Sequence, residues 1–202
     1  MIAKSLLIAS QNPGKIAEIQ SILAPLRLNI LSARELEQTI HVEETGETYA
    51  QNARLKAATF LQKTGIPALA DDTGLAVDAL GGAPGVFSAR YSPKANATDA
   101  DRRDYLLSQL KFEPQPWKAH FQCVVVLATP AGEFFETVGR CDGMIIPDER
   151  GSGGFGYDPI FFMPEYQMTM AELTTDLKNK ISHRAKALVA MMGILKTLFD
   201  SQ

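Results

Sequence analysis

Residues 5–16 read SLLIASQNPGKI, and this stretch indicates how the chain begins to fold. The apolar run at 5–9 is typical of a short buried strand, and the polar residues after it, with Pro13 and Gly14, are typical of a loop. From Ile16 onward, apolar residues recur at the three- and four-residue spacing of a helix. The chain therefore opens with a strand, a loop and a helix, an order found in α/β folds.

Further along, helices and strands alternate before a hairpin follows. Thr48 and Gln51 fit a capping box, and the apolar face after them ends at Gly65, which predicts a helix between Thr48 and Gly65. Thr98 is expected to cap a helix over 99–110. The other expected elements are strands at 28–31 and 66–70, a loop at 81–85, a hairpin of 121–129 with 133–140, and a helix from Ser182 onward. This order predicts the α/β fold class with a mixed sheet.

The composition predicts one globular domain over residues 1–202, with 46% of the residues hydrophobic and a net charge of −3. The acidic balance argues against a nucleic-acid partner, because proteins that neutralise many phosphates carry a basic surplus. The first apolar run is too short for a signal peptide or a membrane span, which favours a cytoplasmic protein without a membrane partner. Cys123 and Cys141 are expected to be free thiols, although their places on either side of the hairpin turn also allow cross-strand proximity.

The loop Ser10-Gln11-Asn12-Pro13-Gly14-Lys15 has features of a phosphate site. N–H groups at a helix N-terminus and the positive end of the helix dipole attract an anion, and Lys15 would add a positive charge. The loop is not a Walker A motif, because the two glycines and the Lys-Ser/Thr pair are absent. The alternative interpretation is a plain turn with a solvated Lys15.

Two acidic segments, Glu43-Glu44 and Asp71-Asp72-Thr73-Gly74, supply the oxygen ligands that a magnesium ion takes. Mg²⁺ usually binds one or two carboxylates, with water and substrate phosphates completing its shell. Side chains alternate between the faces of a strand, so Asp71 and Asp72 both reach one ion only if the strand has already ended. Asp72 is preferred because it lies next to the expected turn. The alternative is that the acidic pairs are solvated surface residues.

The segment Gly151-Ser152-Gly153-Gly154-Phe155-Gly156 matches the letters of a dinucleotide-binding fingerprint. Tyr157-Asp158-Pro159 follows it in place of a helix, so we reject that match. We interpret the segment as a loop that places Phe155 and Asp158 against a ligand, where an aromatic ring suits a purine base. The alternative is that Phe155 is a core residue.

Ser182-His183-Arg184 lies at the start of the last expected helix, with Lys178 shortly before it. Arginine and histidine donate hydrogen bonds that suit a purine carbonyl or a phosphate. The alternative is that these residues are helix caps and surface charges. No second histidine or cysteine accompanies His183 at zinc-site spacing, and no Gly-x-Ser-x-Gly elbow indicates acyl transfer.

Taken together, these motifs resemble those of the inosine triphosphate pyrophosphatase family. In order, they are Ser-x-Asn-x-x-Lys at 10–15, Ala70-Asp71-Asp72-Thr73-Gly74, Gly81-Gly82-Ala83-Pro84-Gly85, Gly153-Gly154-Phe155-Gly156-Tyr157-Asp158-Pro159 and Ile181-Ser182-His183-Arg184. The combination spans the chain from Ser10 to Arg184 and is far more specific than any one part. Thr73 stands where many members carry serine, and it keeps the hydroxyl.

The resemblance implies hydrolysis of non-standard purine nucleoside triphosphates (ITP, dITP and XTP) to the monophosphate and pyrophosphate, which cleanses the nucleotide pool. It implies a long mixed sheet flanked by helices in two lobes, with the active-site cleft between them, a homodimer and a Mg²⁺ cofactor. It assigns Glu43 and Asp72 to the metal, with Asp72 also the catalytic base, and leaves open whether Glu44 shares the metal. The residues that it assigns to the substrate are Ser10, Gln11, Asn12, Pro13, Gly14, Lys15, Lys56, Thr73, Phe155, Gly156, Tyr157, Asp158, Lys178, His183 and Arg184.

Two other functions fit parts of the pattern. The related Maf-like nucleotide pyrophosphatases share the general fold and the opening motif, but they lack the Ser-His-Arg ending seen here. A nucleotide-binding sensor without catalysis would keep Lys15 and the base pocket, and it would not require Asp72 with Glu43. Pyrophosphate release from a panel of nucleotides, with and without Mg²⁺, separates the three.

Overall fold

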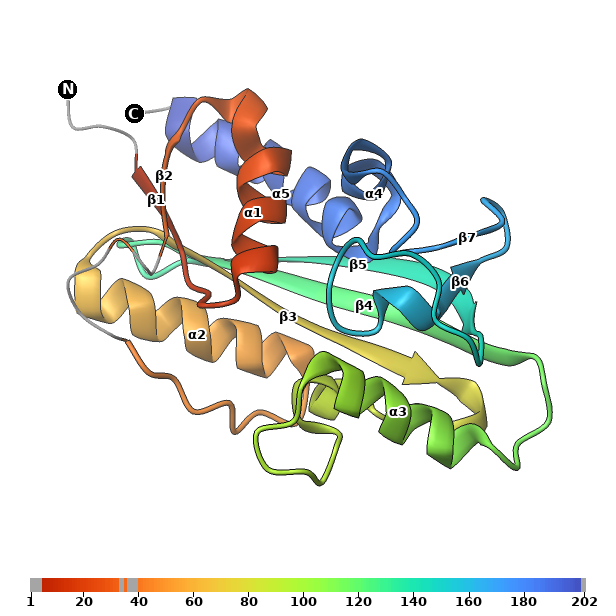
Figure 1. The fold of residues 1–202 in the computed structure, drawn as a ribbon. Coiled ribbons are helices and arrows are strands. Elements are labelled where there is room, and N and C mark those ends of the chain that lie inside the picture. Colours follow the sequence, from red (N-terminus) through yellow and green to blue (C-terminus); the bar gives the residue numbers. More distant parts are fainter. Residues whose placement is uncertain (1–4, 33–34, 36–39, 201–202) are drawn as a thin grey trace. The chain divides into compact units, whose positions relative to one another are not determined.

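The computed structural model describes residues 5–32, 35 and 40–200, in which seven strands form one mixed sheet (Figure 1). The strand order is β2-β1-β3-β4-β5-β6-β7. β1 pairs in parallel with β2 and β3, whereas β6 pairs antiparallel with β5 and β7. The strands are β1 (Ser5–Ile8), β2 (Asn29–Ser32), β3 (Ala68–Val77), β4 (Trp117–Ala128), β5 (Phe134–Ile145), β6 (Phe161–Met163) and β7 (Met168–Thr169).

Five α-helices and several short 3-10 segments accompany these strands in the described residues. No helix there combines the length and apolar character that crossing a membrane requires. The α-helices are α1 (Pro13–Leu23), α2 (Tyr49–Thr64), α3 (Asp99–Leu110), α4 (Thr175–Ile181) and α5 (His183–Asp200), and the 3-10 segments are η1 (Ala24–Leu26), η3 (Asp78–Leu80), η4 (Gly85–Arg90) and η5 (Asp158–Ile160).

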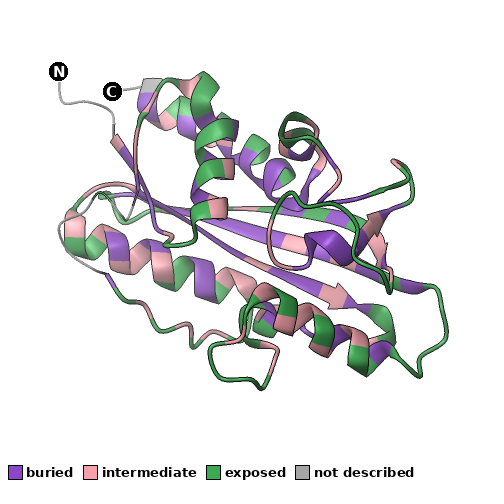
Figure 2. Ribbon diagram, viewed as in Figure 1, coloured by how far each residue is buried: buried purple, intermediate pink, exposed green. Residues whose placement is uncertain are grey.

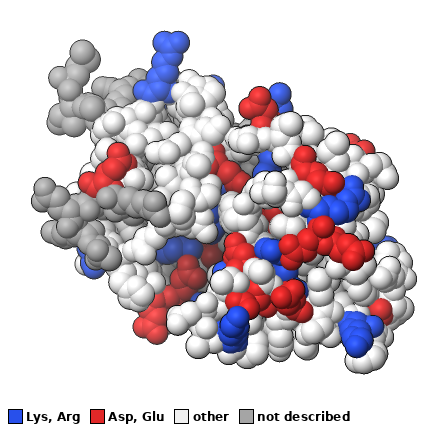
Figure 3. All heavy atoms as spheres, in the orientation of Figure 1, with Lys and Arg blue, Asp and Glu red and all other residues white. Residues whose placement is uncertain are grey.

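The chain folds into two compact units, and each is assembled from separate segments. The first unit comprises residues 1–72, 123–139 and 183–202, and the second comprises 73–122 and 140–182. The division falls inside β3, β4 and β5, so each of these strands contributes to both units. On the face drawn in Figure 3, acidic and basic side chains are interspersed.

In the first unit, alternate residues of the strands pack on two different layers of helices (Figure 1). Leu6 of β1 and Leu69 of β3 pack with α1 and α5, whereas Leu7 of β1 and Ala70 of β3 pack with α2. All four residues are fully buried, and Figure 2 shows β1 and β3 almost wholly buried. Strands buried on both faces form near-continuous apolar runs, as residues 5–9 do.

In the second unit, a separate core forms around α3 and the strand segments of that unit. Leu106 and Leu110 of α3 pack with Trp117, and the rings of Phe121 and Phe161 lie 4.6 Å apart between centroids. Cys141 is buried here and Cys123 is buried in the core of the first unit, and neither thiol forms a disulfide, as expected.

The predicted helix starts are confirmed by their caps. The Thr48 hydroxyl accepts a hydrogen bond from the Gln51 N–H, and the Gln51 side chain accepts one from the Thr48 N–H. Thr98 caps α3 in the same way through Asp101. Gly65 ends α2 with a φ of 70°, a left-handed conformation that glycine adopts without strain.

The prediction that a strand ends at Asp71 and Asp72 is wrong, because β3 continues to Val77. Its extension is stabilised by Leu75 and Val77, which are fully buried in the core of the second unit. The hairpin strands β4 and β5 also extend beyond their predicted limits. α4, β6 and β7 were not predicted, because with seven, three and two residues they are too short to show a clear periodicity.

Candidate active site

β3 presents its two aspartates to opposite faces of the sheet. Leu69 packs in the core that contains α1 and α5, and Ala70 packs in the core that contains α2. Because every second side chain of a strand points to the same face, Asp71 lies on the face of Leu69 and Asp72 lies on the face of Ala70. The two aspartates therefore belong to two different clusters of charged side chains, both in the first unit.

The Asp71 cluster consists of Asp71, Lys15 and Glu18 of α1, and Arg184 of α5. Asp71 Oδ2 lies 3.0 Å from Lys15 Nζ and 3.1 Å from Arg184 Nη2. Arg184 Nη1 donates to Glu18 Oε2 at 2.5 Å. The side chains of Asp71 and Arg184 are each 1% exposed, so two carboxylates and two cations compensate one another in the interior.

The charges of the Asp71 cluster keep Asp71 and Arg184 ionised. Burial favours the neutral carboxyl, but the charges of Lys15 and Arg184, with a contribution from Lys56, hold the pKa of Asp71 well below its usual range. Burial also disfavours the charged form of Arg184, yet Asp71 and Glu18 raise the pKa of the guanidinium. Loss of one member would therefore leave a buried charge without compensation.

The Asp72 cluster consists of Asp72, Asn52 and Lys56 of α2, and Glu44. Lys56 Nζ lies 3.2 Å from Asp72 Oδ1 and 2.7 Å from Glu44 Oε1. Asn52 Nδ2 donates to Asp72 Oδ2 at 3.3 Å. Asn52 and Lys56 lie four residues apart and so share one face of α2.

The environment of Asp72 makes it a better proton acceptor than an ordinary aspartate. Burial has the largest influence and raises the pKa of Asp72, Glu44 adds to the rise, and Lys56 and Lys15 oppose it. Burial together with the charge of Asp72 raises the pKa of Tyr49 to about 12. Lys56 remains cationic, because the neighbouring carboxylates outweigh its burial and raise its pKa. A carboxylate with a raised pKa suits general-base chemistry.

The donor atoms of the Asp72 cluster fit a magnesium ion. Among the described residues, no group of three or more His, Cys, Asp or Glu side chains is arranged to hold a metal ion. Mg²⁺ requires fewer protein ligands, since substrate phosphates and water complete its octahedron. Asp72 and Glu44 already converge on one cation, the ammonium of Lys56. Glu43 is exposed, so Glu44 is the acidic neighbour that this structure places beside Asp72.

The loop before α1 is ordered by its own side chains. Ser10 Oγ accepts from the Asn12 N–H at 3.2 Å, and Asn12 Oδ1 accepts from the Lys15 N–H at 3.1 Å. Gln11 Nε2 donates to the carbonyl oxygen of Ile40 at 3.1 Å. The strand, loop and helix order is confirmed. The alternative of a solvated Lys15 is wrong, because its side chain is 17% exposed and paired with Asp71.

In the second unit, Asp158 organises the glycine-rich loop. Asp158 Oδ2 accepts from the Phe155 N–H at 2.9 Å and from Lys178 Nζ at 2.6 Å. The Lys178 ammonium lies 5.0 Å from the centroid of the Phe155 ring. A Cβ on Gly154 would lie 2.0 Å from Asp158 Oδ2, which explains why a residue without a side chain stands there. Tyr157 is buried, and its hydroxyl donates to the Ser88 carbonyl at 2.9 Å.

A sequence model of the Ham1 family matches residues 6–194 of the chain. The chain belongs to the Ham1 family. It is 45% identical over 198 residues to a dITP/XTP pyrophosphatase of Desulforamulus reducens, and the match covers 98% of both chains. It is 46% identical over 187 residues to a dITP/XTP pyrophosphatase of Geobacter sulfurreducens, covering 92% of this chain and 94% of the relative. The resemblance drawn from the motifs is confirmed.

Solved Ham1 structures share the fold. A HAM1 protein from Coxiella burnetii has a TM-score of 0.86 and 42% sequence identity, with 96% of this chain and 98% of that chain covered. The Staphylococcus aureus Ham1 protein has a TM-score of 0.84 and 36% identity, with 96% and 99% covered. The predicted α/β class with a mixed sheet is confirmed.

Several expected site residues of this Ham1 chain lie together within each unit. In the first unit, Lys15 and Arg184 contact Asp71, while Lys56 contacts Asp72. His183 begins α5 and is 3% exposed. In the second unit, Phe155, Asp158 and Lys178 contact one another, and Thr73 is a half-buried residue of β3.

Two members of the clusters in this Ham1 chain, Glu18 and Asn52, were not predicted from the sequence, and neither was the pairing of Asp71 with Arg184. A signal existed for the first two, because Glu18 stands three residues after Lys15 and Asn52 stands four before Lys56. Polar residues at these spacings share a helix face with a candidate site residue. Asp71 gave no such local signal, since its partner Arg184 is 113 residues away.

Proposed function

We propose that this chain hydrolyses ITP, dITP and XTP to the monophosphate and pyrophosphate in a Mg²⁺-dependent reaction. The observation that carries the proposal is Asp72, a buried carboxyl with a raised pKa, held beside Lys56 in a chain of the Ham1 family. The names of the relatives, which specify dITP and XTP, support the choice of purine triphosphates.

The residues proposed to hold the triphosphate lie in the first unit. Ser10, Gln11, Asn12, Pro13, Gly14 and Lys15 surround the N-terminus of α1, where N–H groups without helical partners attract anions. Lys15 and Lys56 add positive charge, and each is already paired with an aspartate of β3. Phosphate oxygens would compete with these carboxylates for the two ammonium groups.

Asp72 is the proposed catalytic base. It takes a proton from water, the water oxygen bonds to the α-phosphorus, and the bond from that phosphorus to the pyrophosphate oxygen breaks. Lys15 and Lys56 stabilise the negative charge on the departing pyrophosphate. Mg²⁺, held by Asp72 with the Glu43-Glu44 pair, supplies further positive charge to the phosphates when bound. Of that pair, Glu44 is favoured by its contact with Lys56.

The residues proposed to take the base are Phe155, Gly156, Tyr157, Asp158 and Lys178. The Phe155 ring offers a stacking face, and stacking of a base on an aromatic ring contributes about 1–3 kcal/mol. His183 and Thr73 are also proposed to contact the substrate. Arg184 is already bonded to Asp71 and Glu18, so its proposed role is to hold the Asp71 cluster beside the phosphate loop.

We further propose that the protein is a homodimer and that it acts in the cytoplasm, where nucleotides are used for polymerisation. Light scattering coupled to gel filtration measures the oligomeric state, and the mass of a single 202-residue chain would contradict the dimer.

Removing metal from the protein is expected to abolish pyrophosphate release, and added Mg²⁺ is expected to restore it. The measurement is pyrophosphate release from ITP, dITP, XTP, ATP and pyrimidine triphosphates, with chelator and then with excess Mg²⁺. We expect faster release from ITP, dITP and XTP than from ATP, because the carbonyl at position 6 accepts a hydrogen bond where adenine presents a donor. Preference for other nucleotides would favour a Maf-like activity, and binding without release would favour a sensor.

Lys15→Ala is expected to lower kcat/KM for ITP by about tenfold or more, because a hydrogen bond to a charged group is lost. Binding of inosine monophosphate should change less, since the proposed contact is with the phosphate tail. Calorimetric titration with both ligands and steady-state kinetics measure the two effects. Lys63→Ala, an exposed position on α2, is the matched control. An equal loss of affinity for both ligands would make Lys15 a structural residue.

A further inference from the structure

Two side chains of α3 hold the backbone of Gly156, one at its N–H and one at its carbonyl oxygen. Its N–H donates to Asp99 Oδ2 at 2.8 Å, and its carbonyl oxygen accepts from Arg103 Nη1 at 2.8 Å. Asp99 and Arg103 lie four residues apart and so share one face of α3. Two side chains from one helix face thus fix the N–H and the carbonyl of a single residue in the glycine-rich loop, all within the second unit.

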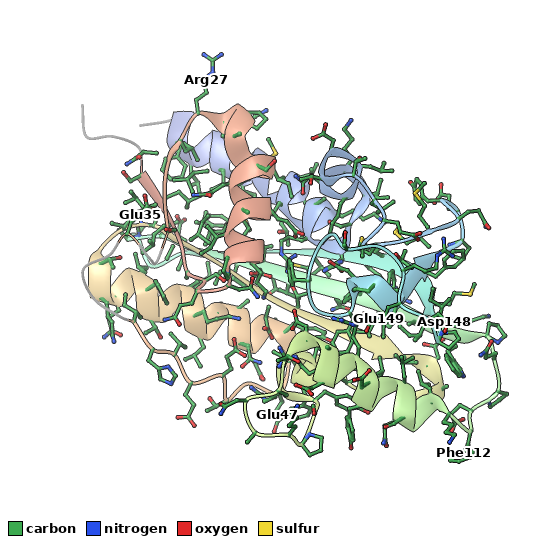
Figure 4. The ribbon with its side chains drawn as sticks, viewed as in Figure 1. Arg27, Glu35, Glu47, Phe112, Asp148 and Glu149 are labelled. Carbon is green, nitrogen blue, oxygen red and sulfur yellow. The ribbon has the colours of Figure 1, made fainter. Side chains whose placement is uncertain are left out.

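Arg103 is itself held in place for this contact. Its Nε lies 2.7 Å from Glu149 Oε1, and its Nη2 lies 2.9 Å from Glu149 Oε2. Figure 4 shows Glu149 beside α3. The Arg103 side chain is 12% exposed although Glu149 is 42% exposed. A two-point contact between a guanidinium and a carboxylate fixes the orientation of both groups, so the remaining Arg103 nitrogen is directed at Gly156.

Asp99 is held in a similar way. Arg102 Nη2 lies 2.7 Å from Asp99 Oδ1, which leaves Oδ2 for the Gly156 N–H. Partial burial raises the pKa of Asp99, but the hydrogen bonds from Arg102 and Gly156 and the charges of Arg102 and Arg103 lower it overall. Asp99 is therefore an ionised acceptor at neutral pH.

Gly156 adopts a backbone conformation that suits glycine, the residue with the most backbone freedom to lose when a loop is ordered. Its φ is 63°, in the left-handed region, and a Cβ built on it would meet no atom within 4 Å. The glycine is thus required by the backbone conformation and not by close packing. Its neighbours are anchored elsewhere, Phe155 through Asp158 and Tyr157 through Ser88, so the α3 contacts complete the ordering of the loop.

We propose that Asp99 and Arg103, with Glu149 behind Arg103, are positioning residues that set the conformation of residues 154–158 and thereby the choice of purine base. The inference rests on the proposed function, in which this loop takes the base. Ordering a loop before binding removes an entropy cost of binding, so releasing Gly156 weakens base binding. The phosphate chemistry, assigned to residues of the first unit, is expected to remain.

The test uses Arg103→Met, Asp99→Ala and the conservative Arg103→Lys in the full-length chain. For Arg103→Met and Asp99→Ala, we expect KM for ITP to rise by about three- to tenfold with kcat within about twofold, and the ITP to ATP ratio of kcat/KM to fall. Arg103→Lys should recover part of the loss, because one ammonium donor still reaches Gly156 but cannot bind both oxygens of Glu149. Arg140→Met, which removes an exposed ion pair with Asp142, is the matched control.

Hydrogen exchange of the peptide that covers residues 154–158 gives a second readout that does not depend on turnover. We expect faster exchange in Arg103→Met and Asp99→Ala than in the wild type or in Arg140→Met. Unchanged exchange, or kcat lowered equally for ITP and ATP at constant KM, would overturn the positioning role and indicate a general effect on the fold. A wild-type chain that releases no pyrophosphate from any nucleotide would instead overturn the proposed function and the selectivity role, and the exchange would still decide whether α3 orders the loop.

Discussion

Replacing Asp72 by asparagine is expected to lower kcat for ITP by at least about 100-fold, the effect of losing a general base. Asparagine keeps the size of the side chain and an oxygen that accepts the hydrogen bond from Asn52. It cannot take a proton from water. Lys56 retains its contact with Glu44, so the positive charge of Lys56 is still compensated and the chain should fold.

Steady-state kinetics with ITP and thermal unfolding by circular dichroism measure the two parts of this expectation. Asp148→Asn is the matched control, since Asp148 is an exposed aspartate of the second unit (Figure 4). A kcat within a few-fold of wild type for Asp72→Asn would remove Asp72 as the base. A comparable loss in Asp148→Asn would show that the assay responds to charge in general.

Replacing Arg184 by methionine is expected to lower the free energy of unfolding by roughly 3–5 kcal/mol, the cost of breaking a buried ion pair by removing one partner. Arg184 and Asp71 are each 1% exposed, and Arg184 also contacts Glu18. The depressed pKa of Asp71 means that this carboxyl stays charged at neutral pH. Lys15 then remains beside Asp71, and it does not replace the contact of Arg184 with Glu18.

Urea unfolding followed by far-ultraviolet circular dichroism measures the loss. Arg140→Met, in which an exposed pair with Asp142 is removed, should change stability by about 0–1 kcal/mol. A loss below about 1 kcal/mol in Arg184→Met would contradict the compensation argument.

Kinetics on Arg184→Met also decide between two roles for this residue. If Arg184 read the base, the ITP to ATP ratio of kcat/KM would collapse in the variant. Its guanidinium is bonded to Asp71 and Glu18 in this structure, so we expect both substrates to be slowed alike and the ratio to persist.

The helix starts at Thr48 and Thr98, the strand and loop before α1, and the hairpin turn were predictable because their signals lie within a few residues. A cap is a hydrogen bond between residues three positions apart, and a turn residue acts on its own backbone. The motif combination likewise identified the family and nominated Lys15, Lys56 and Asp72. Such features depend on residues that are close in the sequence, so they can be predicted without knowing the fold.

The tertiary structure decided that Asp71 and Asp72 contact different partners. From the sequence, the strand could end at the two aspartates or continue past them. It continues to Val77, because Leu75 and Val77 are buried in a core formed by distant segments. Continuation places the two carboxylates on opposite faces, one facing Arg184 and the other facing Lys56.

The sequence by itself determined the capped helix starts, the strand and loop before α1, the family and the inventory of reactive side chains. The tertiary structure decided which of them meet: Arg184 with Asp71 across 113 residues, and Arg103 with Gly156 across 53. The physical reason is that local hydrogen bonds act between chain neighbours, whereas these pairs form when apolar faces of distant segments are buried together. Burial excludes water from the pair of Arg184 and Asp71, so these two charges depend on one another and not on solvent.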